Sequence, residues 1–314
     1  MKQKYNILVT GCGGDIGQSI GKILKSHPMF NRVIGCDISD EHAGKFIFDE
    51  TLKISNCRDA TYLPLLETII KKHQIDLILP ISEPELRFIT EKQIQHSFLN
   101  KPLICANLKA MEIGFDKFAT AEFLKFSGLP YPETFIVGEM RNAKLPLILK
   151  RRTGSGSKSI FLLKGINDFN FYKNRYPEFI AQEFLNNENE EYTCGLFRSK
   201  KNEVRTIIYK RKLVDSYSGY GVLAANGSID ALLVKIAIKL DLIGSINIQL
   251  RITDKGPCVF EINPRFSSTV KFRHMMGFED VIWSVQDVLE IPISPYIESP
   301  TGTKFYKGFH EYIN

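Results

Sequence analysis

Several features that would place the chain in a particular class of protein are missing from it. The sequence has no apolar run near 18 residues, so a membrane-spanning helix is not expected. Its six cysteines lie far apart without a CxxC pair, and its six histidines show no HxxxH spacing, which disfavours disulfide bonds and a zinc site. The N-terminal stretch lacks the apolar core and cleavage site of a secretory signal. We therefore expect a cytoplasmic protein with reduced thiols and no membrane partner.

The charge and size of the chain indicate which classes of ligand and which domain organisation to expect. The net charge of +6 comes from 41 basic and 35 acidic residues spread along 314 positions. This mild excess suits small anionic ligands, and no basic stripe of the kind that binds nucleic acid is present. A hydrophobic content of 44% can bury a large core, which we expect to divide into two or three units. A homodimer is the default for an enzyme of this size.

Strands and helices alternate in the N-terminal third of the chain. Apolar strand patterns lie at residues 5–10, 32–37, 76–80 and 101–105. A helical pattern covers about 61–72. This alternation predicts a parallel sheet with right-handed crossovers, a Rossmann-like domain over residues 1–107.

A glycine cluster follows the first strand and precedes a helix. Glycines stand at positions 11, 13, 14 and 17, and Asp37 lies about twenty residues further on. This spacing fits a dinucleotide-binding fingerprint, which makes an NAD(P)-dependent oxidoreductase one alternative. The same glycines also suit a tight strand-to-helix turn in any doubly wound sheet.

A smaller unit is expected over residues 108–182. A helix at 117–127 is followed by strands at 145–150 and 160–163. The loop 151–159 between these strands is rich in glycine, serine and basic residues, so its amides and hydroxyls could wrap phosphates. It has neither the Walker A spacing nor that of a kinase glycine loop. A mobile basic hairpin tip is the plain alternative.

The remaining residues, 183–314, form the third expected unit. Strands at 191–197 and 203–214 precede a helix that Ser228 is expected to cap. Two further apolar strands flank the turn 254–256, and this arrangement predicts a hairpin.

The hairpin is expected to bring three oxygen-bearing side chains together. Gln249 lies on its first strand, and Glu261 and Asn263 lie on its second. Such side chains supply hard oxygen ligands, which Mg²⁺ takes when it is shared with substrate phosphates. Arg265, just beyond, offers a planar donor fork for phosphate or carboxylate. A metal site beside an anion clamp predicts phosphoryl transfer.

Several short motifs occur in an order that resembles the ATP-grasp superfamily, most closely its carbamoyl-phosphate-synthase-like carboxylate–amine ligases. Along the chain they are Asp116-Lys117, Lys150, the loop 154–159, the run 182–185, Glu191-Tyr192, Gln249 and the run 261–265. The resemblance covers nearly the whole chain, because those enzymes carry a Rossmann-like domain before a two-lobed ATP-grasp fold. It therefore implies an α/β and α+β architecture with a small phosphate-loop lobe and a large metal-site lobe.

The resemblance also implies an activity and its site. The implied enzyme is an ATP-dependent ligase that uses Mg²⁺, with Mn²⁺ as a substitute, and joins a small carboxylate to an amine or another nucleophile. The residues implied for ATP binding are Lys117, Lys150, Gly154, Ser155, Gly156, Ser157, Gln182, Glu183, Phe184, Leu185 and Glu191. Within this set the lysines contact phosphates, Glu183 and Leu185 hold the adenine, and Glu191 binds the ribose. The metal site implied is Gln249, Glu261 and Asn263, and the catalytic residues implied are Lys150 and Arg265.

Two points depart from the family pattern or stay open. Many relatives have a second carboxylate where this chain has Gln249, so only Glu261 is charged and the triphosphate is implied to supply the missing charge. A non-catalytic nucleotide-binding protein is a further alternative. Five polar residues lie in the region that borders the substrate in relatives, and each of them either binds the substrate carboxylate or lies on the surface. They are Lys210, Arg211, Tyr220, Arg273 and His274.

Overall fold

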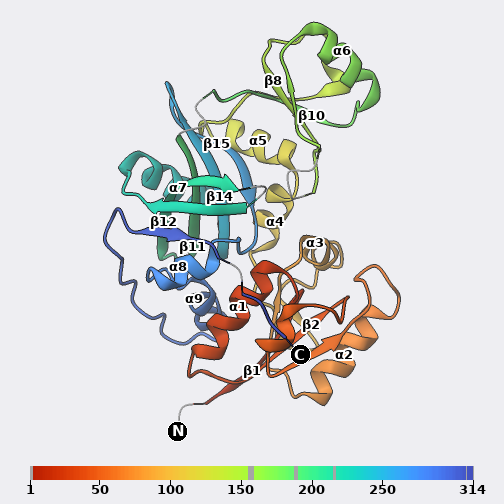
Figure 1. The fold of residues 1–314 in the computed structure, drawn as a ribbon, viewed down its shortest axis with the longest axis vertical. Coiled ribbons are helices and arrows are strands. Elements are labelled where there is room, and N and C mark those ends of the chain that lie inside the picture. The colour runs from red at the N-terminus through yellow and green to blue at the C-terminus, as the bar shows by residue number, and fades with distance from the viewer. Residues whose placement is uncertain (1–2, 155–158, 187–189, 215–216, 309, 314) are drawn as a thin grey trace.

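The chain folds into an N-terminal domain and two lobes. The computed structural model describes residues 3–154, 159–186, 190–214, 217–308 and 310–313. Figure 1 shows the N-terminal domain at the bottom, the small lobe at the top and the large lobe between them. Within these ranges, no helix is both long and apolar enough to cross a membrane.

A parallel sheet with helices on both faces forms the N-terminal domain. In spatial order its strands are β3 (Glu50–Lys53), β2 (Phe30–Asp37), β1 (Tyr5–Thr10) and β4 (Leu77–Pro80). Its helices are α1 (Asp15–Ser26), the 3₁₀ helix η1 (Ala43–Phe46), α2 (Tyr62–Lys72) and α3 (Glu83–Glu91). Successive residues of a strand point to opposite faces, so Ile7 packs in the α1 core and Leu8 in the α2 core. The predicted Rossmann-like sheet is confirmed.

The predicted strand at 101–105 is wrong in extent. Only Lys101–Pro102 (β6) is a strand, and it pairs antiparallel with Ser97–Phe98 (β5). Leu103 forms a single parallel bridge with Ile78 of β4. Pro102 has no N–H to donate, so it cannot continue a regular ladder along the parallel sheet.

The small lobe is an antiparallel sheet covered by one helix. Its strands in spatial order are β7 (Thr134–Ile136), β10 (Ile180–Glu183), β8 (Leu147–Lys150) and β9 (Phe161–Leu163). The 3₁₀ helix η2 (Val137–Glu139) follows β7, and α6 (Ile166–Arg175) packs on one face through Phe169. The other face of the sheet carries Lys150 and points toward the large lobe.

A larger antiparallel sheet forms the large lobe. Its strands in spatial order are β15 (Gly256–Asn263), β14 (Gly244–Thr253), β11 (Glu191–Arg198), β12 (Val204–Val214), β13 (Tyr217–Leu223) and β16 (Lys304–Tyr306). Its helices are α7 (Gly227–Leu240), α8 (Val270–Met275) and α9 (Asp280–Val288). The expected hairpin is confirmed, because β14 and β15 pair antiparallel across the turn after Thr253.

Helices from neighbouring parts of the chain cross between these units. Helices α4 (Leu108–Gly114) and α5 (Lys117–Phe126) pack against β15, and Met111 and Leu124 lie in the large-lobe core. Helices α8 and α9 share a core with α1 of the N-terminal domain. The boundaries at 107 and 182 stay predictions.

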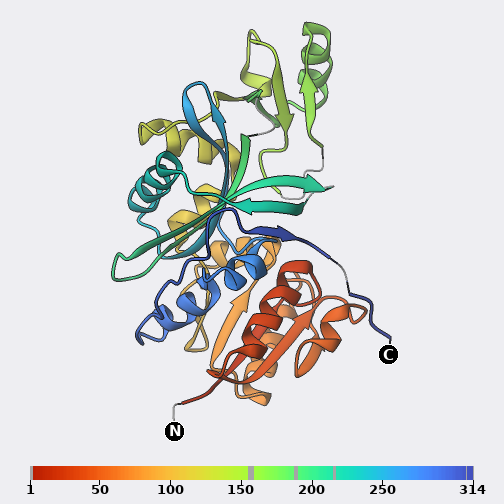
Figure 2. The ribbon, with the colours of Figure 1, turned by 60° about the vertical axis from the view of Figure 1, so that its left-hand side comes forward.

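The C-terminal segment also connects two parts of the molecule. After β16 it leaves the large lobe and lies along the N-terminal domain (Figure 2). Lys307 forms an ion pair with Asp15 at the start of α1, and the ring of Tyr312 stacks on Phe46 with 4.8 Å between centroids. These contacts tie the edge of the large-lobe sheet to the glycine loop region.

The cap of α7 differs from the one expected. The side chain of Asn226, and not that of Ser228, accepts hydrogen bonds from the amides of Ser228 and Ile229. Asn226→Ala should therefore lower the free energy of unfolding by about 1 kcal/mol, because two amides at the helix start lose their acceptor. Urea unfolding measures this loss. Ser228→Ala is the matched control and should cost less than half as much; an equal loss would contradict the assignment.

Candidate active site

The β14–β15 hairpin places the expected metal-binding side chains on one face of the large-lobe sheet. Gln249 and Glu261 are direct cross-strand partners, and Asn263 pairs with Asn247 two positions along. Residues two apart on a strand share a face, so Glu261 and Asn263 point the same way. The opposite face carries Ile248 and Ile262, which are fully buried under α7 and α5. The apolar alternation of these strands therefore forces the polar side chains outward, toward the small lobe.

Lys150 reaches this face from the end of β8 in the small lobe. Its Nζ donates to Oε1 of Gln182 at 2.8 Å and to the carbonyl of Phe260 at 3.4 Å. Gln182 in turn donates to Oγ1 of Thr134 at 3.0 Å, so the amide is held on both sides. Burial lowers the pKa of Lys150 to about 8; Glu261 acts in the opposite direction. The buried Lys150 amine has only a neutral hydrogen-bond partner in Gln182, so its positive charge is available to bind an anion.

Lys117 approaches the same carboxylate from the start of α5. Its Nζ lies 3.8 Å from Oε1 of Glu261 and donates to the carbonyl of Gly154 at 2.6 Å. Asp116 caps α5 and also accepts from Nε of Arg152 at 2.8 Å. This contact anchors the base of the loop after β8 to the helix that carries Lys117. The predicted residues Ser155, Gly156 and Ser157 lie outside the described residues.

Arg265 lies just beyond the hairpin, where the large lobe meets the N-terminal domain. Burial lowers the pKa of its guanidinium, and Glu83 and Glu261 act in the opposite direction. Its Nη1 donates to the carbonyl of Phe266 at 2.9 Å. Pro80 at the end of β4 lines the same small cavity as Arg265. The cation therefore lies at the border of both domains.

The segment after β10 links the two lobes. Cross-strand pairing puts Gln182 opposite Ile148 and Glu183 opposite Leu147, so the side chains of Gln182 and Glu183 lie on opposite faces. The Glu183 carboxylate accepts from the amide of Glu133 at 3.2 Å, away from Lys150. The Glu183 side chain therefore lies on the opposite face of the small-lobe sheet from Lys150 and Gln182. Phe184 is half-buried and Leu185 is buried.

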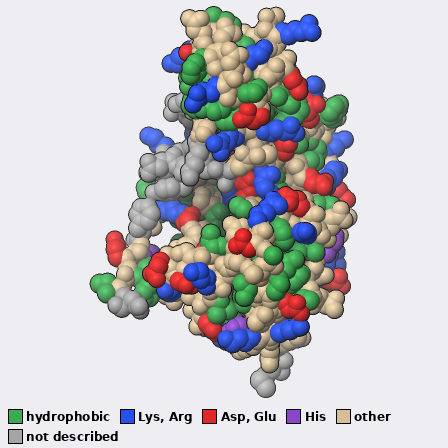
Figure 3. Space-filling model, turned by 90° about the vertical axis from the view of Figure 1, so that its right-hand side faces the viewer, with side chains coloured by type: hydrophobic (Ala, Val, Ile, Leu, Met, Phe, Trp, Pro, Cys, Tyr) green, Lys and Arg blue, Asp and Glu red, His purple; other side chains and the backbone are tan. Residues whose placement is uncertain are grey.

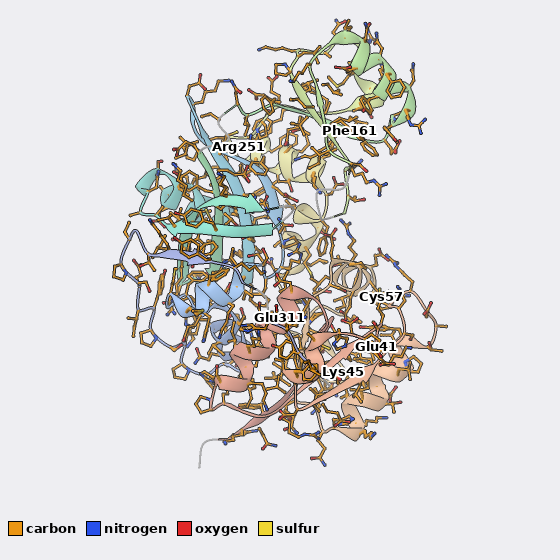
Figure 4. All side chains as sticks on the ribbon, viewed as in Figure 1. Glu41, Lys45, Cys57, Phe161, Arg251 and Glu311 are labelled. Atoms are coloured by element: carbon orange, nitrogen blue, oxygen red, sulfur yellow. The ribbon has the colours of Figure 1, made fainter. Side chains whose placement is uncertain are left out.

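Glu191 is enclosed by two arginines. Its Oε1 accepts from Arg211 at 2.8 Å, and its Oε2 accepts from Arg251 at 2.7 Å. Arg251 also donates to the carbonyl of Leu185 at 2.6 Å, which joins this pair to the segment between the lobes. Figure 4 shows Arg251 at the end of the sheet nearest the small lobe. Both oxygens of Glu191 are therefore engaged, and its predicted ribose contact stays a prediction.

These groups meet where the lobes and the N-terminal domain converge. Seen from the right-hand side of Figure 1, the surface is hollowed below the small lobe, and Lys and Arg side chains border the hollow (Figure 3).

Residues 115–269 match the ATP-grasp domain family, and residues 7–104 match the PylC-like N-terminal domain family. The chain therefore contains an ATP-grasp domain, and a PylC-like N-terminal domain precedes it.

Individual relatives agree with this assignment. Carbamoyl-phosphate synthase of Methanobrevibacter smithii is 24% identical over 119 residues, which are 35% of this chain and 32% of the relative. The match thus spans about a third of the length of that curated relative. The carbamoyl-phosphate-synthase-like character expected from the motifs is confirmed.

Solved structures support the same fold. The ADP complex of N5-carboxyaminoimidazole ribonucleotide synthetase superposes with a TM-score of 0.76 at 15% identity, covering 95% of this chain and 80% of the other. The L-amino acid ligase from Bacillus licheniformis superposes with a TM-score of 0.68 at 16% identity, covering 91% of this chain and 70% of the other. At these identities the likeness shows the ATP-grasp fold, as predicted.

The glycine loop of this ATP-grasp chain is closed by its own aspartate. The amide of Gly13 donates to Oδ2 of Asp37 at 2.8 Å. A Cβ on Gly17 would lie 2.3 Å from the carbonyl oxygen of Gly11, so glycine is needed for α1 to pack on the loop. The tight-turn interpretation of these glycines therefore has a direct structural basis.

Of the five candidate substrate residues, some lie on the face of the large-lobe sheet that carries Gln249 and others do not. Arg273 is fully buried and pairs with Asp280 at 3.1 Å, so it is not available to a substrate. Lys210 pairs with Glu190 on the α7 face of the sheet. Arg211, one position further along β12, points to the opposite face and contacts Gln249. Tyr220 packs on Tyr306.

Half-buried His274 lies near Glu279, with 3.9 Å between Nδ1 and Oε1. Burial lowers the pKa of its imidazole, and Glu279 acts in the opposite direction.

Sequence reasoning missed three contacts of the site. The Asp116–Arg152 pair, the Arg251–Glu191 pair and the Arg211–Gln249 contact each join residues from separate strands or helices. A weak signal was present for the Arg251–Glu191 pair, because Arg251 lies two positions after Gln249 and residues two apart on a strand share a face. Arg211 and Gln249 lie on β12 and β14, which β11 separates, so their contact depends on the order of the strands in the sheet. The Asp116–Arg152 pair could only be found once the loop base was seen beside α5.

Proposed function

We propose that the protein is an ATP-dependent ligase that activates a substrate carboxylate as an acyl phosphate and joins it to an amine. The observation that carries this proposal is the convergence of Lys117, Lys150 and Glu261 between the lobes. A desolvated lysine and a second cation beside one carboxylate suit a triphosphate shared with a metal ion. The ATP-grasp neighbours include an ADP complex and an L-amino acid ligase, which supports the same reaction class.

Different residues of the chain would bind the different parts of ATP. Lys117 and Lys150 would contact the phosphates, together with the loop from Gly154 to Ser159. The main-chain carbonyl of Glu183 and the amide of Leu185 would hold the adenine. Arg265 would steady the transferred phosphoryl group, since its half-buried guanidinium has no carboxylate within 4.0 Å among the described residues.

The residues present also fit Mg²⁺. Glu261 and Asn263 offer hard oxygens on one face, and Asn263 has no side-chain hydrogen bond to any residue that the structure describes. These two would hold the ion, with Gln249 beside them. When bound, the ion would neutralise charge on the phosphates.

The bonds of the proposed reaction balance in two steps. A carboxylate oxygen attacks the γ-phosphorus, a new P–O bond forms, and the bond to ADP breaks. The amine then attacks the acyl carbon, a C–N bond forms, phosphate leaves, and the amine proton passes to solvent or phosphate. Lys150 and Arg265 would spread the charge that builds on the transferred group, and closure of the lobes would exclude water.

A screen for ADP release tests this function. Purified protein with ATP and Mg²⁺ is incubated with paired pools of carboxylic acids and amines, including bicarbonate and amino acids. We expect ADP release that needs one acid pool and one amine pool together. Release that is independent of both pools, or that forms no C–N product by mass spectrometry, would contradict the ligase assignment.

Nucleotide binding separates the ligase from the oxidoreductase alternative. ATP with Mg²⁺ should raise the melting temperature by several degrees, because ligand that binds only the folded state stabilises it. NAD⁺ and NADP⁺ should leave it unchanged, since Asp37 already accepts the amide of Gly13. A thermal-shift panel makes this comparison, and stabilisation by NAD(P) alone would revive the oxidoreductase.

A further inference from the structure

The guanidinium of Arg211 lies between two oxygens beside the candidate metal site. Its Nη2 donates to Oε1 of Glu191 at 2.8 Å and to Oε1 of Gln249 at 2.9 Å. Its Nε donates to the same Glu191 oxygen at 3.1 Å, and its Nη1 to Oγ of Ser218 at 3.4 Å. The side chain is only 7% exposed, so it is part of the wall of the site.

The strand pairing places this group next to the metal face. Tyr209 of β12 lies opposite Thr193, and Thr193 lies opposite Gln249, so Arg211 shares their face two positions further along. Glu261 is the partner of Gln249 on the other side. Gln249 therefore has a guanidinium on one side and the single charged ligand candidate on the other.

We propose that Arg211 occupies the position of a second divalent cation, so that the nucleotide-loaded site holds one ion, carried by Glu261 and Asn263. This inference rests on the proposed function, which supplies the nucleotide and the first ion. A Mg²⁺ ion that is shared with a nucleotide takes only one or two oxygen ligands from the protein, and phosphates and waters complete its octahedron. Here Oε1 of Glu191 and Oε1 of Gln249 converge on Nη2 of Arg211.

The local charge also disfavours a second divalent ion beside Gln249. Arg211 and Arg251 share the one carboxylate of Glu191, which leaves an excess of one positive charge beside Gln249. A divalent ion there would be repelled at short range in a site shielded from water. Glu261 is different, because its Lys117 contact of 3.8 Å is long and leaves room for a ligand.

Counting bound ions tests the proposal. Mn²⁺ is titrated into the protein with saturating β,γ-imido-ATP, and the electron paramagnetic resonance signal of free Mn²⁺ gives the number bound. We expect one Mn²⁺ per wild-type chain. Arg211→Gln should bind two, because Glu191 and Gln249 are then free to hold the second.

Arg251→Gln is the matched control. It removes a guanidinium from the other oxygen of Glu191 but leaves Arg211 on Gln249, so it should still bind one Mn²⁺. Two ions bound to wild-type protein would overturn the inference, and so would one ion in a folded, nucleotide-bound Arg211→Gln variant. The wild-type count decides the matter even if that variant does not fold.

A separate calorimetric titration with the nucleotide analogue distinguishes the two levels of failure. Wild-type protein that binds no nucleotide would contradict the proposed function, and this inference would fall with it. Wild-type protein that binds the nucleotide with two ions would contradict only the role of Arg211.

Discussion

Replacing Glu261 with glutamine should lower Mg²⁺-dependent ADP formation by about 100-fold or more while leaving the fold intact. Glu261 is the one carboxylate among the metal ligand candidates, and glutamine keeps its shape but removes its charge. A charge-assisted contact contributes about 1.5–3 kcal/mol, which corresponds to roughly 10–150-fold, and weaker metal binding adds to this loss. Initial rates of ADP release and a Mn²⁺ titration measure both effects.

A control in the same hairpin makes this result specific. Asp254→Asn also removes one negative charge, but Asp254 is exposed in the turn at the far end of the strands. It should leave the rate within about twofold of the wild type. Turnover of Glu261→Gln near the wild-type rate would remove Glu261 from the metal site.

Replacing Lys150 with methionine should weaken nucleotide binding and turnover by about 10–150-fold, the loss of one charge-assisted contact. Methionine is similar in size to the buried Lys150 side chain beside Gln182 but carries no charge. Lys144→Met is the matched control, because Lys144 is exposed in the same lobe. Calorimetry with an unreactive ATP analogue measures the affinity, and an unchanged affinity together with an unchanged rate would exclude Lys150 from the site.

The pH dependence of binding provides a sharper readout for Lys150. The pKa of about 8 means that the free site loses this positive charge as the pH rises through 8. Since only the charged amine attracts phosphate, wild-type affinity should fall above pH 8 by up to about tenfold per pH unit. Lys150→Met should lack this step. Glu261→Gln should shift it to lower pH, because Glu261 raises the pKa of Lys150.

Local pattern was sufficient for the elements that present the site. Alternating apolar residues around the turn 254–256 predicted the hairpin, and its register brings Gln249 opposite Glu261 as expected. The strand-and-helix alternation predicted the parallel N-terminal sheet. These predictions succeed because each rests on a local pattern of apolar and turn residues, even where the strands that pair lie far apart in the sequence.

Contacts between distant segments were not predictable in the same way. The helices α4 and α5 join the large-lobe core although they precede the small lobe in sequence. Arg273 was expected to be either a substrate contact or a surface residue, but it is fully buried, and Asp280 and Asn247 hold it in the interior. The sequence shows that such a residue is charged and cannot show which partner neutralises it.

The order and chemical types of the residues from Lys117 to Arg265 determined the family and the candidate ligands, because they are properties of the chain itself. The tertiary structure decided which of these groups are available. It turned the Glu183 side chain away from Lys150 and placed two guanidiniums on Glu191. The reason is physical: hydrogen bonds and ion pairs depend on distances between strands, and those distances exist only after the sheets have packed.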